Sequence, residues 1–154
     1  NVIADIGNGT VNLLQVVDRK VDMRSMATEA SGVKDCVVAM RFALANNHSG
    51  AKVDDSIIER VIRSGTARID AEYVETLKDA AQRYTDSLFR RFREYGYDPK
   101  TMQLYVVGGG SCLVRHFSRY DPALVTIDSD IHANAKGYEW LAYERLRTKG
   151  GGKA

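Results

Sequence analysis

The sequence "IADIGNGTVNLL" (residues 3–14) carries the strongest local structural signal in this chain. An Asn-Gly pair between two apolar runs predicts a tight β-hairpin, with φ > 0 at the turn. A carboxylate, Asp5, precedes this turn, and a hydroxyl, Thr10, follows it. The stretch is therefore either a plain chain reversal or one half of a phosphate-binding device. Taken alone, it favours the plain turn.

Composition indicates a globular domain that does not bind nucleic acid or membranes directly. The 154 residues suit one domain. The net charge of +2 is too small to indicate general electrostatic binding of an anionic partner. No apolar run is long enough to span a bilayer. Cys36 and Cys112 form no CxxC pattern, so we expect buried free thiols in a reducing cytoplasm. Because the sequence starts without Met and directly in a strand pattern, we interpret it as part of a longer protein.

Hydrophobic periodicity predicts a mixed α/β fold. Three strands come first, at 1–5, 10–18 and 21–28. Helices follow at 31–47, 54–65 and 70–95. The remainder is predicted as a strand at 102–107, a helix at 112–120, a strand at 123–127 and a closing helix at 133–146. The second strand is apolar on both sides, which favours a sheet covered on both faces.

Two helices carry further detail. Ser56 and Glu59 have capping-box spacing, and Gly65 fits a C-terminal stop. The helix at 70–95 has apolar residues at steps of three and four, which predict one buried stripe. This stripe consists of Val74, Leu77, Ala81, Tyr84, Leu88, Phe92 and Tyr95.

A second glycine segment, "VVGGGS" (106–111), joins a predicted strand to a helix start. Such a junction offers free N–H groups and close backbone approach to an anion. Leu113 stands where a dinucleotide-binding fingerprint needs glycine, and no GK[ST] is present for a P-loop. Alone, the three glycines favour a packing turn. Together, the two glycine segments describe a site that closes around a nucleotide.

This arrangement resembles the actin/Hsp70/sugar-kinase superfamily. "DIGNGT" (5–10) looks like its second phosphate motif and "VVGGGSCLV" (106–114) like its adenosine motif. The closer resemblance is to bacterial actin-like plasmid-segregation proteins of the ParM type. It includes "TEASGV" (28–33) and "ANAKGYEWLA" (133–142). It implies an actin-like (ribonuclease H-like) mixed sheet flanked by helices, with domain II at 1–146, a helical subdomain at about 31–96 and a flexible tail at 147–154.

The resemblance also implies a function. It implies a cytoplasmic filament, driven by ATP or GTP with Mg²⁺, that moves plasmid or conjugative-element DNA. The expected partners are an N-terminal domain of the same protein, further copies in the filament, and a DNA-binding adaptor protein on the plasmid. The first phosphate loop would belong to that N-terminal domain. We therefore expect this chain alone to bind nucleotide weakly and to be inactive as an enzyme.

The residues of the first motif suit these roles. Gly7 and Gly9 let the turn present N–H groups to phosphate oxygens, and Asn8 and Thr10 add side-chain donors. Asp5 would repel phosphate, so as the catalytic residue it suits a water of the Mg²⁺ shell or the attacking water. The second motif would lie under the α-phosphate and adenosine, through Gly108, Gly109, Gly110 and Ser111.

Other residues leave alternatives open. Glu29 and Lys78 are predicted either to reach the ribose or base or to lie on the surface. Asn12 stands where many relatives carry a second Asp, which leaves Asp5 as the motif's one carboxylate. A metabolite kinase of the same superfamily and a non-hydrolysing actin-like adaptor module remain alternative functions.

Overall fold

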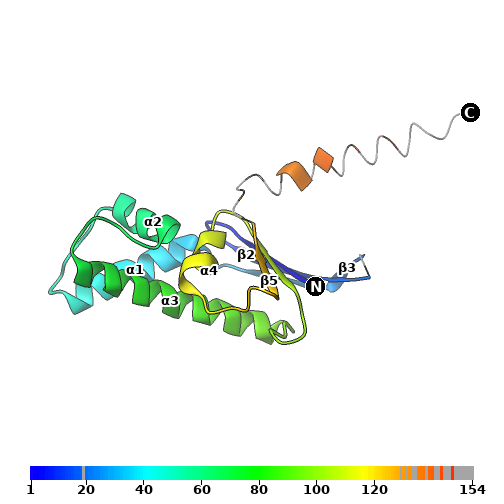
Figure 1. Ribbon diagram of the computed structural model, residues 1–154, viewed down its shortest axis with the longest axis horizontal. Coiled ribbons are helices and arrows are strands. Elements are labelled where there is room, and N and C mark those ends of the chain that lie inside the picture. Colours follow the sequence, from blue (N-terminus) through cyan, green and yellow to red (C-terminus); the bar gives the residue numbers. More distant parts are fainter. Residues whose placement is uncertain are drawn as a thin grey trace, which may run out of the picture.

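Five strands form one mixed sheet in the order β3-β2-β1-β4-β5 (Figure 1). Their bounds are β1 Val2–Ile6, β2 Val11–Val17, β3 Lys20–Glu29, β4 Leu104–Val107 and β5 Val125–Ile127. The hairpin strands β1, β2 and β3 pair antiparallel, whereas β4 pairs parallel with both β1 and β5. The register of β2 against β3 shifts between Leu13 and Gln15, where a bulge interrupts the ladder. The sheet is therefore antiparallel at one side and parallel at the other.

The structure is a computed structural model that describes residues 1–18 and 20–128 and scattered positions beyond them. Those positions are 130, 132, 135–137, 139, 140, 143 and 147. The closing helix expected at 133–146 therefore lies largely outside the described residues, as does the tail expected at 147–154. No helix in the described ranges is both long and apolar enough to cross a membrane.

Within residues 20–128 four helices accompany the sheet: α1 Val33–Asn47, α2 Asp55–Ser64, α3 Ala71–Glu94 and α4 Ser111–Phe117. The first three are inserted between β3 and β4, and α1 packs along α3. Figure 1 shows this insertion extending to the left of the sheet, while α4 lies between the insertion and the strands. This is the predicted mixed sheet with flanking helices and a helical insertion.

One face of the sheet forms the core. Val2, Ala4 and Ile6 alternate along β1 with exposed fractions of 1% or less, and Leu104 and Val106 do the same on β4. On the opposite face Tyr105 is 40% exposed, and the apolar Leu14 is only half-buried. The prediction that the sheet is covered on both faces is therefore wrong for the described residues. Apolar residues on the second side of a strand do not by themselves mean that another element packs on that side.

The predicted stripe of α3 is buried from Val74 to Phe92, but the prediction that Tyr95 continues it is wrong. Tyr95 is 40% exposed, and Tyr97 is buried in its place at 3%. The reason is that α3 ends at Glu94, and Gly96 takes the left-handed conformation with φ +88°. After that turn the helical spacing no longer decides which residue faces the core.

The start of α2 differs from the predicted capping box. The N-cap is Asp54, whose carboxylate accepts the Ser56 N–H at 2.8 Å. Hydrogen bonds from Ser56 hold the pKa of the Asp54 carboxyl below its usual value. The C-terminal stop is as expected, because Gly65 takes φ +74° and its N–H donates to the Val61 carbonyl.

The cap can be tested by two substitutions. Asp54→Ala removes the acceptor for Ser56 N–H, and we expect the melting temperature to fall by a few degrees. Glu59→Ala keeps that bond, so the melting temperature should stay nearly unchanged. Because the folded-state pKa of Asp54 is lowered, its stabilisation is present at neutral pH and lost as pH falls through that pKa. Thermal unfolding at several pH values measures this dependence. An equal fall of the melting temperature in Glu59→Ala would instead support the capping box predicted from Ser56 and Glu59.

Candidate nucleotide site

The carboxyl ends of β1 and β4 lie side by side, because these two strands are parallel neighbours. The turn at residues 7–10 follows β1, and the three glycines follow β4. The Gly110 N–H donates to the Ile6 carbonyl at 2.8 Å, which joins the two segments directly. Ligands of open α/β sheets bind at this edge, so both glycine segments stand at the expected place for a ligand.

The turn directs its carbonyls and its N–H groups to different sides. The Gly7 N–H closes it by donating to the Thr10 carbonyl at 2.8 Å. The carbonyls of Gly7 and Asn8 accept the first N–H groups of α1, from Val33 at 3.1 Å and Lys34 at 3.0 Å. Among the hydrogen bonds of the described residues, none takes the N–H groups of Asn8, Gly9 or Thr10. We call these three N–H groups the nest; those of Asn8 and Gly9 point away from α1, because the C=O and N–H of a trans peptide point in opposite directions.

The backbone of this turn corrects one sequence prediction. The predicted tight hairpin is present, because β1 and β2 pair antiparallel up to Ile6 and Val11 and residues 8 and 9 connect them. The predicted positive φ is wrong, because no residue from 7 to 10 has one. The physical reason is the bonding to α1, which draws the Gly7 and Asn8 carbonyls away from the hairpin. A Cβ on Gly9 would meet only the Lys34 Nζ, at 4.0 Å. Gly9 therefore leaves room on its outer side, next to a cation.

The second glycine segment contains three glycines in different environments. Gly108 takes φ +88°, and a Cβ there would lie 2.4 Å from Asp5 Oδ1, so the Asp5 carboxylate lies against this backbone. A Cβ on Gly110 would lie 2.4 Å from Ile6 Cγ2. At Gly109 a Cβ would meet nothing within 4 Å. Only Gly109 therefore borders open space, and Gly108 and Gly110 are needed by the packing.

Ser111 and Asn12 are engaged within the protein. Ser111 is 2% exposed, and its N–H donates to the Gly108 carbonyl at 3.1 Å. The Asn12 side chain, at the motif position where a carboxylate was considered, accepts the Thr28 hydroxyl at 2.8 Å. Asp5 is half-buried and pairs in register with Asn12 and Val107. Asp5 is thus the carboxylate that lies between the two glycine segments.

A cavity of about 220 Å³ opens beside Gly109. It is bounded by the turn, α1, α2 and the start of α4. Its lining residues are Asn8, Val33, Val37, Glu59, Ile62, Arg63, Gly109 and Cys112. Apolar walls with a few charged groups at the rim are typical of sites for small organic ligands. Asn8 belongs both to this lining and to the nest.

The structure places Glu29 and Lys78 elsewhere. Glu29 accepts the Tyr95 hydroxyl and lies 3.7 Å from the Arg91 guanidinium, and Lys78 pairs with Glu75 at 2.9 Å. The charged residues that line the cavity are Glu59 and Arg63 of α2, which sequence reasoning did not select. Their spacing of four residues on an amphipathic helix was the available signal, but it does not distinguish a site from a solvated face.

Neither cysteine offers a reactive thiolate. Burial, with a smaller contribution from Cys112 nearby, raises the pKa of Cys36 to about 12. Burial also raises the pKa of Cys112, which is half-buried rather than buried as expected. The thiol that borders the cavity is therefore neutral at pH 7 and belongs to its wall.

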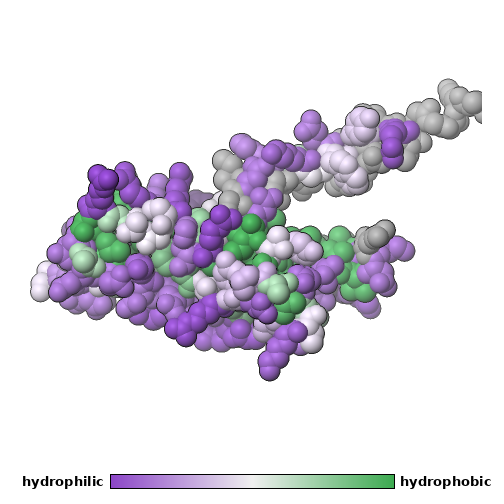
Figure 2. Space-filling model, in the orientation of Figure 1, coloured by the Kyte–Doolittle hydropathy of each residue, from purple (hydrophilic) through white to green (hydrophobic). Residues whose placement is uncertain are grey.

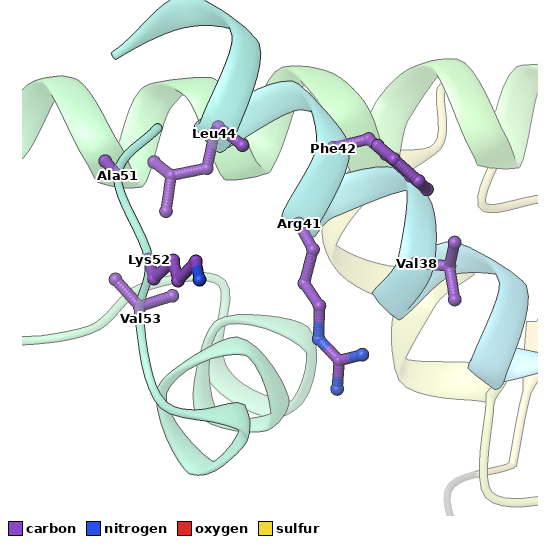
Figure 3. A pocket seen from close by; sticks show the side chains of 8 residues that line it. Val38, Arg41, Phe42, Leu44, Ala51, Lys52 and Val53 are labelled. Carbon is purple, nitrogen blue, oxygen red and sulfur yellow. The ribbon is translucent and has the colours of Figure 1, made fainter. Parts of the chain in front are cut away.

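A larger cavity lies on the other part of α1 and has a different lining (Figure 3). It measures about 430 Å³, and Val38, Phe42, Leu44, Ala51 and Val53 contribute apolar side chains to it. None of its lining residues comes from either glycine segment. Its charged lining residues are Arg41, which pairs with Asp55, and Lys52, so this cavity is set apart from the candidate site by its position and not by a lack of cations.

No protein-family model matches this chain, and no curated protein matches it. Solved structures do match. ParM of Bacillus thuringiensis with ATP aligns over 85% of this chain and 42% of its own, at TM-score 0.59 and 12% identity. The archaeal actin homolog Ta0583 in complex with ADP aligns over 94% and 49%, at TM-score 0.60 and 21% identity.

The apo pSK41 ParM protein aligns over 96% of this chain and 41% of its own, at TM-score 0.66 and 18% identity. Identities this low show the fold alone, and that fold is actin-like. This chain spans less than half of the length of each of these three structures.

The glycines at the site should respond differently to an added methyl group. Gly108→Ala forces a strained φ and a clash with Asp5, so we expect the free energy of unfolding to fall by about 1–3 kcal/mol. Gly109→Ala points into open space and should change it by less than about 0.5 kcal/mol. Urea unfolding of both variants measures the difference. Equal stabilities would contradict the described approach of Asp5 to Gly108.

Proposed function

We propose that this chain is the nucleotide-binding second domain of a cytoplasmic, actin-like, filament-forming ATPase or GTPase that segregates plasmid or conjugative-element DNA. The observation that carries the proposal is the nest of three unbonded N–H groups beside the cavity at Gly109. The likeness to structures titled as ParM with ATP and as an archaeal actin homolog with ADP supports it.

The turn provides the phosphate contacts in this proposal. The N–H groups of Asn8, Gly9 and Thr10 donate to the β- and γ-phosphate oxygens, with no charge to desolvate on the protein side. Lys34 stands beside Gly9 with an exposed ammonium group and neutralises part of the phosphate charge. Sequence reasoning did not identify Lys34, because its closeness to the turn depends on how α1 begins.

The cavity beside Gly109 holds the nucleoside in this proposal. Val33, Val37 and Ile62 offer apolar surface to the base, and Gly109 lets the α-phosphate and ribose approach the backbone. Glu59 and Arg63 at the rim supply an acceptor and a donor for the ribose hydroxyls or the base edge. Gly108, Gly110 and Ser111 act through the packing that keeps Gly109 open.

Asp5 fits the second sphere of a bound Mg²⁺. Within the described residues no group of three or more His, Cys, Asp or Glu side chains could hold a metal, so phosphate oxygens and water must supply most ligands. When bound, the ion neutralises charge that develops on the transferred phosphoryl group. Asp5, fixed against Gly108, accepts a hydrogen bond from a water and thereby orients it.

The rest of the machinery lies outside this chain in the proposal. A first domain with its own phosphate loop completes the nucleotide clamp, copies of the protein assemble into filaments, and a DNA-binding adaptor connects the filament to the plasmid. The known structures of this fold are about twice as long as the part that this chain matches, which supports a second domain.

Nucleotide binding tests the proposed contacts. In the full-length protein Gly9→Val fills the space outside the turn, and Gly109→Val fills the cavity mouth. We expect each to weaken binding of a fluorescent ATP or GTP analogue roughly 10-fold or more, since one lost charge-assisted contact costs about this much. Lys78→Ala, which removes a cation paired with Glu75, should leave affinity unchanged. The proposed site is rejected if both glycine variants bind nucleotide normally while Lys78→Ala has lost binding.

Hydrolysis tests the role of Asp5. Asp5→Asn in the full-length protein keeps the side-chain shape but weakens the acceptor that orients the water. We expect turnover to fall about 100-fold while nucleotide affinity changes little, because positioning supplies much of phosphoryl-transfer catalysis. Phosphate release and analogue binding measure the two quantities. Unchanged turnover in a folded variant would remove the catalytic assignment.

Assembly tests the filament. ATP or GTP with Mg²⁺ should move the full-length protein into the pellet on high-speed sedimentation, and Asp5→Asn filaments should persist longer because they convert slowly to the diphosphate state. Protein that stays monomeric over a wide concentration range, with either nucleotide, would favour a kinase or an adaptor module.

A further inference from the structure

The connection between β3 and α1 is held by the long helix α3. The Tyr84 hydroxyl of α3 reaches the carbonyl oxygens of Ser31 at 3.0 Å and Gly32 at 2.8 Å, so one O–H is shared between two acceptors. Tyr84 and Ser31 are 9% and 8% exposed, so this bonding is shielded from water. Burial raises the pKa of the Tyr84 hydroxyl, which keeps it a donor at neutral pH.

The same connection is in direct contact with the turn at residues 7–10. A Cβ on Gly32 would lie 2.3 Å from the Asn8 carbonyl oxygen, which is too close for any side chain. The next two residues, Val33 and Lys34, donate to the Gly7 and Asn8 carbonyls. The position of residues 31–34 therefore fixes the direction of these carbonyls, and so of the Asn8 and Gly9 N–H groups, which belong to the same two peptide units.

Packing alone does not require a hydroxyl at position 84. Tyr84 belongs to the apolar stripe of α3, and a phenylalanine ring would fill the same space. A buried hydroxyl without a partner is unfavourable, so its value here lies in the two carbonyls that it bonds. Those carbonyls belong to the last two residues before α1 begins.

We propose that Tyr84 is a positioning residue for nucleotide binding: its hydroxyl fixes the Ser31 and Gly32 carbonyls, holds the start of α1 against the turn, and thereby sets the free N–H groups of Asn8 and Gly9. The part that concerns nucleotide rests on the proposed function. The part that concerns the turn is a property of the folded chain without ligand.

The neighbouring residue provides a matched control. Thr85 also has a buried hydroxyl on α3, but it donates to the Phe117 carbonyl at the end of α4, with the Gln82 carbonyl also at 2.9 Å. Thr85→Val removes this hydroxyl, just as Tyr84→Phe removes the other, and both keep the core filled. Both variants should lose a similar amount of thermal stability, but only Tyr84→Phe acts on residues 31–34.

Amide hydrogen exchange in the nucleotide-free chain tests the positioning directly. Tyr84→Phe should raise the exchange rates of the Val33 and Lys34 N–H groups roughly two- to tenfold beyond those in Thr85→Val, the range expected for one lost hydrogen bond. NMR of the labelled chain resolves these two amides. Equal rates in the two variants would overturn the proposal, whether or not the protein binds nucleotide.

Affinity for a fluorescent ATP or GTP analogue, measured on the full-length protein, tests the link to the ligand. Tyr84→Phe should weaken binding several-fold, and Thr85→Val should leave it unchanged at the same loss of melting temperature. Faster exchange without weaker binding would overturn the link to nucleotide. If the unmodified protein binds no nucleotide, the proposed function fails, and the exchange rates still decide whether Tyr84 positions the turn.

Discussion

The approach of Gly32 to the Asn8 carbonyl is the constraint on which the site depends. It leaves no room for a side chain, and it brings the start of α1 onto the turn at residues 7–10. The N-cap of α1 is this glycine, with no side-chain cap. The first N–H groups of α1 are satisfied by turn carbonyls instead, so helix start and turn complete each other's hydrogen bonding. The N–H groups of residues 8–10 take no part in this bonding.

The parallel pairing of β1 with β4 brings the second half of the site to this place. Two segments about a hundred residues apart in sequence meet at one sheet edge, joined by the Gly110 N–H to the Ile6 carbonyl. The contact between Asp5 and Gly108 follows from the same pairing. The insertion then closes the third side with α1 and α2, whose residues Val33 and Arg63 line the cavity.

Local sequence signals predicted the elements well, because burial stripes and glycine stops act over a few residues. The stripe of α3 failed only at Tyr95, just beyond the helix end. The site was harder to predict, since its details depend on contacts between distant segments. Gly32, Tyr84 and Arg63 take part in such contacts, and their local sequence does not distinguish them from ordinary turn, core and surface residues. The Asn-Gly pair misled for the same reason, because α1 rather than the hairpin sets the turn's backbone.

The outermost strand, β3, has a consequence for how copies of this chain can meet. Its exposed side chains include the apolar Val21, Met23 and Met26, and Figure 2 shows hydrophobic surface at this end of the molecule. An open strand edge allows pairing with another chain, but charged Lys20 and Arg24 interrupt this one, and the bulge at residues 23–26 of β3 breaks its own ladder with β2. These features hinder the addition of another strand at β3. The β3 edge therefore disfavours the edge-to-edge strand pairing that leads to cross-β aggregates.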